Sequence, residues 1–138
     1  KEDLDKFIAK NKLTTGGELK IDIKEVRSPE SNSTIVGQMV AEGLEKRLPF
    51  RRVLKQTLSK VAAHKEVKGV KIALSGRLGG AEMSRREWLM NGQIPLQTIR
   101  ADIDFARVRA HLPYGDIGIK VWIYKGEVFD TKDGKKTV

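Results

Sequence analysis

Cysteine is absent from this 138-residue chain, which excludes disulfides and thiolate metal sites. Histidine occurs only at His64 and His111, and neither has a partner at metal-ligand spacing, so both are expected to be structural or surface residues. No apolar run approaches the roughly 18–20 residues that a bilayer-spanning helix needs. The sequence also offers no Ser, His and Asp set for nucleophilic catalysis. We therefore expect no catalytic residue, no metal, no cofactor and no membrane partner.

Acidic residues are scarce where basic residues are most frequent. Between residues 46 and 71 nine Lys or Arg residues stand against one acid, Glu66. Nearly all of the formal net charge of +9 therefore lies in this segment. Such a local excess places a positive field on one part of the molecule and indicates a polyanionic partner.

The hydrophobic pattern predicts an α+β fold. Apolar residues recur at helical spacing over 33–47 and 50–64, with Pro49 between the two helices, and they alternate at strand spacing over 70–74, 99–105 and 117–123. A short helix is predicted for 82–90. This order predicts two amphipathic helices packed on one face of a mostly antiparallel sheet. The N-terminal part reads as a helix over 2–11 and a strand over 19–23, and the polar segment 28–33 is the best domain boundary.

The helix predicted over 50–64 carries a row of cations. At about 100° per residue, Arg51, Arg52 and Lys55 fall together on the side opposite Val53 and Leu58. A solvated helix face is the ordinary interpretation of such a run. However, no acidic residue stands three or four positions away, and like charges at this spacing repel each other mildly. An anionic ligand would offset that repulsion.

A glycine-rich loop follows the strand predicted over 70–74. Gly76, Gly79 and Gly80 match neither the dinucleotide-binding fingerprint nor a P-loop. With the neighbouring Arg77 and Arg85, the loop could still bring backbone N–H groups close to a phosphate. A flexible strand-to-helix turn with surface arginines is the other interpretation, and the chemistry alone leaves both open.

Two other features have structural explanations. Asp102 and Asp104 stand two apart on a predicted strand, where they could act in acid–base chemistry or bind a cation. With Arg100 on the same side, a salt-bridged polar face is the favoured interpretation. Trp88 and Trp122 are expected to be packing residues.

Five segments, taken together, resemble one family. They include Phe50-Arg-Arg-Val-Leu-Lys55 and Ser75-Gly-Arg-Leu-Gly-Gly-Ala-Glu82, and the others are 69–72, 95–104 and 114–127. In this order they strongly resemble ribosomal protein S-three of bacterial or organellar type, over nearly the whole chain. The resemblance implies that 1–28 is the C-terminal remnant of a KH domain, 29–127 a ribosomal α+β domain and 128–138 a polar tail. The KH Gly-x-x-Gly loop would lie upstream of Lys1, so KH-type RNA binding is not expected of these residues alone.

The resemblance also implies a function in the head of the small ribosomal subunit. Arg51, Arg52 and Lys55 match positions that line the messenger-RNA entry and help to open structured messages. The expected partners are mRNA, small-subunit ribosomal RNA and neighbouring ribosomal proteins, and the expected location is a ribosome in the bacterial cytoplasm, a plastid or a mitochondrion. A free-standing RNA-binding regulator is the alternative, and an enzyme using Asp102 and Asp104 is a third. The residues expected to contact ribosomal RNA are Arg47, Arg77, Gly79, Gly80, Arg85, Arg86 and Arg100.

Overall fold

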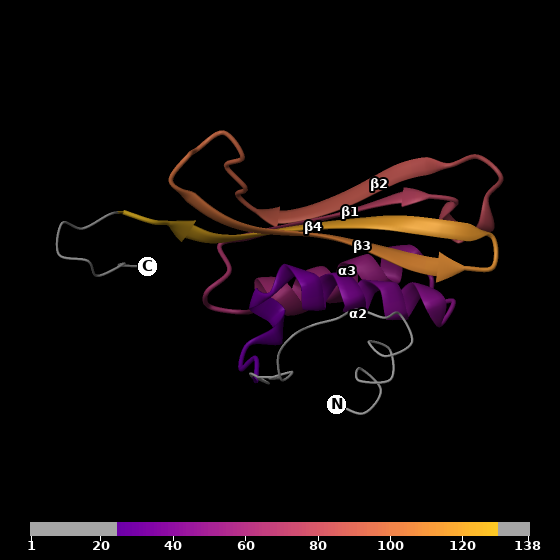
Figure 1. Cartoon of the computed structure of the whole chain (residues 1–138), viewed down its shortest axis with the longest axis horizontal. Helices are drawn as coiled ribbons and strands as arrows, with labels where there is room; N and C mark the ends of the chain where they lie inside the picture. The colour runs from indigo at the N-terminus through magenta and orange to yellow at the C-terminus, as the bar shows by residue number, and fades with distance from the viewer. Residues whose placement is uncertain (1–24, 130–138) are drawn as a thin grey trace, which may run out of the picture.

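The computed structural model describes residues 25–129. Figure 1 shows two helices against one face of a four-stranded sheet, and no helix among the described residues lies on the other face. The predicted α+β fold with two helices on one face is confirmed. The helix–strand unit expected over 2–23 and most of the expected tail lie outside the described residues. In chain order the elements are η1 (Pro29–Ser31), α2 (Ser33–Glu45), α3 (Phe50–Ala62), β1 (Gly69–Gly76), η2 (Leu78–Gly80), β2 (Arg85–Gly92), β3 (Ala101–Leu112) and β4 (Gly115–Glu127).

The sheet is antiparallel throughout, with the strand order β2-β1-β4-β3. Alternate residues of the two central strands point toward the helices, so that Val70 and Ile72 of β1 are buried beside Val121 and Ile123 of β4. Burying these apolar side chains is the main stabilising contribution to the fold. The helix side of this core is made by Val36, Val40 and Leu44 of α2 and by Val53, Leu54 and Val61 of α3.

The short helix predicted over 82–90 is wrong, because residues 85–90 belong to strand β2 and residues 82–84 form no helix. Leu89 is half-buried opposite Ile72 of β1, whereas Trp88 and Met90 point the other way and are exposed. Glu, Leu, Met and Arg favour a helix, but propensity is a weak determinant of structure, and pairing along the whole of β1 overrides it. Trp88, Leu89 and Met90 are all apolar, so the segment carries only a weak period-2 signal for a strand. Trp88 is therefore not a packing residue of the core.

The prediction that Asp102, Asp104 and Arg100 form a salt-bridged face is also wrong. The ion pairs among the described residues include none of these three side chains. The pairing of β3 with β4 also shifts register between Asp102 and Ile103. Asp104 instead accepts a hydrogen bond from the backbone N–H of Ser33, at 2.8 Å. It thereby satisfies one of the free N–H groups at the start of α2, beside the two held by the side chain of Asn32.

Replacing Asp104 with alanine is expected to lower the free energy of unfolding by about 1–2 kcal/mol, because a helix-terminal N–H loses a charged acceptor. Urea denaturation measures the change. Asp104→Asn keeps an acceptor and should cost less, and the exposed Asp102→Ala should change little. Equal losses for Asp102→Ala and Asp104→Ala would contradict this assignment.

Two glycines face each other where β1 begins and β2 ends. Gly69 pairs with Gly92, and a Cβ on Gly92 would lie 2.3 Å from the carbonyl oxygen of Lys68. A Cβ on Gly69 would lie 2.0 Å from the carbonyl oxygen of Gln93. Gly92 also has a φ of +75°, in the left-handed region that glycine adopts without strain. Side chains are therefore excluded at both positions.

Candidate nucleic-acid interface

Helix α3 presents its cations to solvent, as its periodicity predicts. Arg51, Arg52 and Lys55 are exposed, while Val53 and Leu54 are buried in the core. The helix contains no acidic residue, and its first turn, where the helix dipole favours anionic side chains, holds two arginines instead. Cationic charge and dipole thus add up to a positive field at the start of α3.

A carboxylate on β2 holds one of these cations in place. Glu87 lies 3.5 Å from the Nε of Arg51 and 3.3 Å from the Nε of Arg85. The guanidinium groups of both arginines also lie over the ring of Phe50, at 5.7 and 5.6 Å from its centroid. Exposed ion pairs contribute little to stability, but here they orient two guanidinium groups around one ring. Arg52 and Lys55 have no carboxylate partner among the described residues.

Next to this cluster lies a cleft of about 390 Å³. Its walls come from the α2–α3 connection, the glycine-rich loop and the β3–β4 hairpin. The described structure brings Arg47, Arg77, Gly79 and Gly80 together here, and these are four of the residues that sequence reasoning selected. Apolar side chains make up much of the rest of the lining: Leu44, Leu48, Phe50, Leu112, Tyr114 and Ile117.

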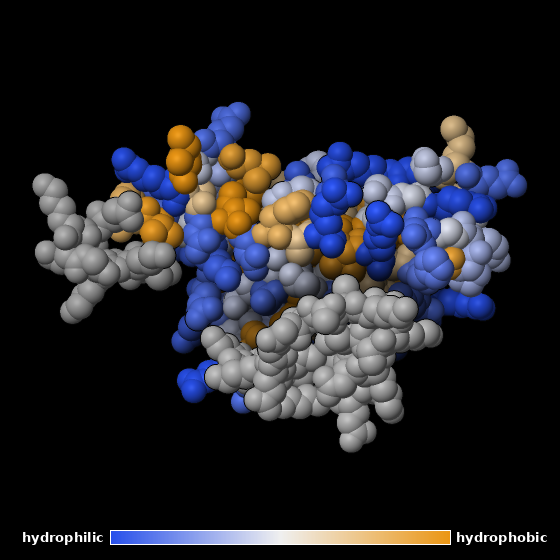
Figure 2. All heavy atoms as spheres, in the orientation of Figure 1, coloured by the Kyte–Doolittle hydropathy of each residue, from blue (hydrophilic) through white to orange (hydrophobic). Residues whose placement is uncertain are grey.

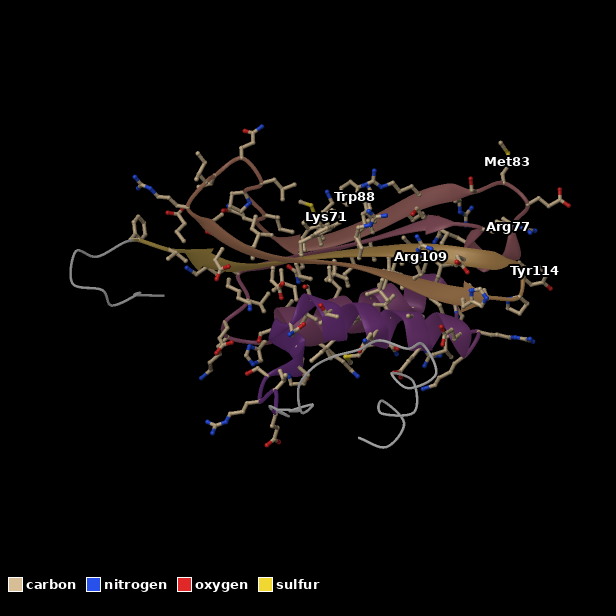
Figure 3. All side chains as sticks on the ribbon, viewed as in Figure 1. Lys71, Arg77, Met83, Trp88, Arg109 and Tyr114 are labelled. Atoms are coloured by element: carbon tan, nitrogen blue, oxygen red, sulfur yellow. The ribbon has the colours of Figure 1, made fainter. Side chains whose placement is uncertain are left out.

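The glycine-rich loop is ordered by Arg77. Its Nε donates to the carbonyl oxygen of Ala81 at 2.9 Å, and its Nη1 donates to that of Tyr114 at 3.3 Å. The guanidinium group also lies 5.6 Å from the centroid of the Tyr114 ring. Figure 3 shows Arg77 and Tyr114 at the same end of the sheet. Gly79 and Gly80 both have positive φ and lie in the short 3₁₀ helix η2. The chain then continues into strand β2 and not into the α-helix that the strand-to-helix interpretation required.

Arg47 occupies a strained position at the rim of the cleft. It has a φ of +58°, the only positive φ of a non-glycine residue in the described chain. The backbone N–H of Arg47 donates to the carbonyl oxygen of Leu44, and the backbone N–H of Leu48 donates to the carbonyl oxygen of Gly43. This is the hydrogen-bond pattern of a Schellman motif at a helix C-terminus. Glycine is the usual residue at this position, since a side chain there costs roughly 1–2 kcal/mol. An arginine at such a site suggests selection for something other than stability.

Two predicted site residues lie away from the cleft. Arg86 is exposed on the sheet face that the helices do not cover. Arg100 lies at the other end of the sheet, just before β3, with its guanidinium group 5.6 Å from the centroid of the Phe129 ring. Figure 2 shows apolar side chains gathered at that end, where Leu96 and Ile99 of the β2–β3 connection are exposed. The predicted residues therefore do not form a single site.

Sequence reasoning missed Phe50, Glu87 and Tyr114. Phe50 stands next to the recognised cations, so its ring could have been noticed as a support for them. Glu87 is 36 residues from Arg51 and Tyr114 is 37 residues from Arg77. No local pattern links residues at such separations, and only the pairing of the strands brings them together.

The arrangement can hold phosphate groups. Arginine donates two parallel hydrogen bonds to a phosphate, and glycine allows a polyanion to approach the backbone closely. Among residues 25–129 there is no group of three or more His, Asp or Glu side chains placed to hold a metal ion. No helix in that range is long and apolar enough to cross a membrane. His64 is half-buried, and the largely exposed ring of His111 contacts the carboxylate of Asp116.

Comparison with known proteins identifies the family. Residues 40–123 match the family described as ribosomal protein S3, C-terminal domain. Small ribosomal subunit protein uS3 of Caldicellulosiruptor bescii is 48% identical over 121 residues, covering 88% of this chain and 54% of the relative. The proteins of the same name from Clostridium botulinum and Lawsonia intracellularis are 50% and 46% identical, covering 92% and 93% of this chain and 58% and 60% of the relatives. The chain spans just over half the length of these relatives. It therefore belongs to the ribosomal protein S3 family, by way of that family's C-terminal domain.

Proposed function

We propose that the chain is a structural part of the small ribosomal subunit that binds RNA through its α3 end. The observation that supports this best is the meeting of Arg47 and Arg77 in one cleft, with Arg85 over the ring of Phe50 at its wall and the exposed cations of α3 beside it. The relatives' name, small ribosomal subunit protein, agrees with such a function. In this proposal the cleft, with Gly79 and Gly80, binds ribosomal RNA. Arg86 and Arg100 would contact ribosomal RNA or neighbouring proteins of the subunit head from their own separate sites.

Arg51, Arg52 and Lys55 would hold the phosphates of messenger RNA where it enters the subunit. Long cationic side chains on a rigid helix attract a passing strand without reading its bases, so the interaction is independent of sequence. Holding single-stranded phosphates as the message advances favours the open state of a hairpin over the paired state. No nucleotide hydrolysis is involved. Glu87 neutralises part of the charge of Arg51. The other two cations, Arg52 and Lys55, should therefore contribute more to the attraction of RNA.

The proposal extends to domain organisation and location. Residues 29–127 would be the ribosomal C-terminal domain, 1–28 the end of a KH domain and 128–138 a polar tail. The matched relatives come from bacteria, which favours a ribosome in the bacterial cytoplasm over one in a plastid or mitochondrion.

Replacing Arg47 with glycine tests the binding function of the cleft. The change relieves the positive φ and should raise the free energy of unfolding by about 0.5–1 kcal/mol. If Arg47 contacts ribosomal RNA, the more stable variant should nonetheless join small subunits less well. Urea denaturation measures stability, and co-migration with small subunits in sucrose gradients at moderate salt measures assembly.

Arg47→Asn separates the two effects in this experiment, because asparagine tolerates a positive φ but carries no charge. It should show the same assembly loss. Unimpaired co-migration of both variants would contradict a binding function for Arg47. Failure of the unaltered protein to co-migrate with subunits at all would favour the free-standing RNA-binding regulator instead.

A further inference from the structure

The sheet face that the described helices leave uncovered has a composition of its own. Figure 3 shows Lys71 and Trp88 beside each other on this side of the sheet. The alternation along the four strands brings cationic and aromatic residues to it and sends the aliphatic core residues to the other face. The residues in question are Lys71 of β1, Arg86, Trp88 and Met90 of β2, Phe105, Arg107 and Arg109 of β3, and Lys120 and Trp122 of β4.

Three aromatic rings and one lysine lie side by side on this face: Trp88 of β2, Lys71 of β1, Trp122 of β4 and Phe105 of β3. The Nζ of Lys71 lies 5.0 Å from the ring centroid of Trp88 and 5.4 Å from that of Trp122. The rings of Trp122 and Phe105 are 5.2 Å apart at a tilt of 38°. Trp88 and Phe105, at the two ends of this group, are 51% and 47% exposed. A water-facing surface with this much aromatic area indicates a ligand that covers it.

Cations lie beside this group and begin one alternation, about 7 Å, along the strands from Phe105 and Trp122. Lys120 stands directly opposite Arg107, a like-charge pair that destabilises an isolated sheet. Arg109 of β3 lies opposite Gly118 of β4, and Arg86 of β2 lies in register with that glycine on the other side of β1. None of these cations has an ion-pair partner within the described part of the chain. The nearest acid on this face is Asp116 at its edge, which is engaged with His111.

We propose that this face, hereafter the open face, binds unpaired RNA. Phosphates would lie along Arg86, Arg107, Arg109 and Lys120, and bases would stack on the exposed rings of Trp88 and Phe105. The proposal goes beyond the function of the cleft and the α3 cations, because the open face lies on the other side of the sheet. The proposal for the open face and the proposed function of the cleft and the α3 cations can therefore fail independently in experiments.

The combination of charge and aromatic rings favours unpaired RNA over other ligands. A duplex offers phosphates to the cations but buries its bases, which would leave the rings uncovered. Flat sheets that bind single strands use the same pairing of exposed aromatic rings with flanking cations. Cations without acidic neighbours suit a polyanion, because protein-binding surfaces are depleted of charged residues at their centres, although they are enriched in aromatic residues and arginine. An acidic protein surface is therefore the competing occupant, and the test must separate the two.

The chain carries its own reporter for this face. Trp88 and Trp122 are its only tryptophans, and both lie on the open face. A decauridylate RNA that stacks there should quench the intrinsic tryptophan fluorescence. Quenching should persist in a variant with alanine at Arg51, Arg52 and Lys55, because those residues belong to the opposite side. Persistence in that background separates the open face from the proposed mRNA function.

Two substitutions should weaken the binding in different ways. Arg107→Gln with Arg109→Gln removes two phosphate contacts, so the logarithmic salt slope of binding should fall by about 1.4. Phe105→Leu keeps an apolar side chain but removes a stacking ring, so affinity should fall about tenfold at any salt concentration. Lys60→Gln with Lys65→Gln is the charge-matched control on exposed residues of the helix side, and it should leave quenching unchanged. Circular dichroism checks that each variant is folded.

Three results would overturn the proposal. The first is an absence of quenching by decauridylate. The second is an equal loss of binding in the Lys60/Lys65 control and the Arg107/Arg109 variant, which would indicate a general charge effect. The third is quenching by an oligoglutamate peptide but not by RNA, which would assign the open face to an acidic protein.

Discussion

Ribosomes with alanine at Arg51, Arg52 and Lys55 are expected to translate messages with stable hairpins several-fold more slowly, while unstructured messages are translated at nearly the normal rate. The three side chains are exposed and alanine favours a helix, so the fold should be unchanged. Removing three phosphate contacts should also lower the logarithmic salt slope for binding single-stranded RNA by about 2, since each contributes about 0.7. Making the changes in the chromosomal gene tests the variants in the protein as the cell makes it.

A second triple variant has the same loss of charge elsewhere. Lys46, Lys60 and Lys65 are exposed lysines outside the proposed mRNA contact, and their replacement by alanine should not slow hairpin messages selectively. Single variants should rank Arg52→Ala and Lys55→Ala above Arg51→Ala, because Glu87 already neutralises part of the Arg51 charge. Equal slowing on both kinds of message would mean that the α3 cations act in assembly. Unchanged rates would mean that they form an ordinary solvated face.

Alanine at Gly92 is expected to lower the free energy of unfolding by about 3 kcal/mol or more, the upper range for a single substitution. Its Cβ would lie 2.3 Å from the carbonyl oxygen of Lys68 and 2.9 Å from the Cα of Gly69. Backbone atoms cannot rotate away as a flexible side chain can, so the β1–β2 pairing itself would have to open. Urea denaturation followed by circular dichroism measures the loss.

Gly79→Ala is the matched control for backbone conformation. Gly79 has a φ of +69°, close to the +75° of Gly92, but the nearest atom to its added Cβ would be 4.0 Å away, on the ring of Phe50. Its replacement should therefore cost only the strain of a positive φ, about 1 kcal/mol. The difference between the two variants isolates the steric contribution at Gly92. Similar losses at both positions would contradict the close approach of β1 and β2.

Much of the fold follows from local patterns in the sequence. The two helices were predicted within two residues of their observed ends, because Asn32 and Pro49 mark where they begin and their apolar residues recur at helical spacing. The strands that contain Ile72 and Ile119 alternate clearly between apolar and polar residues. In the segment that became β2 the periodicity was weak and the residues favour a helix, so propensity gave the wrong element. Strand pairing, which no local window contains, decided that segment.

The candidate site was predictable only in part. The α3 cations share one helix, so their common face follows from spacing alone. Arg47 and Arg77 could be selected for their chemistry, but their meeting in one cleft depends on the β3–β4 hairpin reaching the glycine-rich loop. The cations of the open face, such as Arg107 and Lys120, come from different strands, and their direct pairing depends on a register that the sequence does not reveal.

The order of the strands has a further consequence, for the behaviour of separate copies of the chain. Strands β2 and β3 form the two edges of the sheet, and each has unpaired backbone groups along one side. Such edges recruit further strands unless charges discourage it. Edge-to-edge pairing of two copies would place like charges beside one another. These charges are Arg85 and Arg86 on β2, and Arg107 and Arg109 on β3. The residues suited to a polyanion thus also hinder separate copies of the chain from aggregating through their sheet edges.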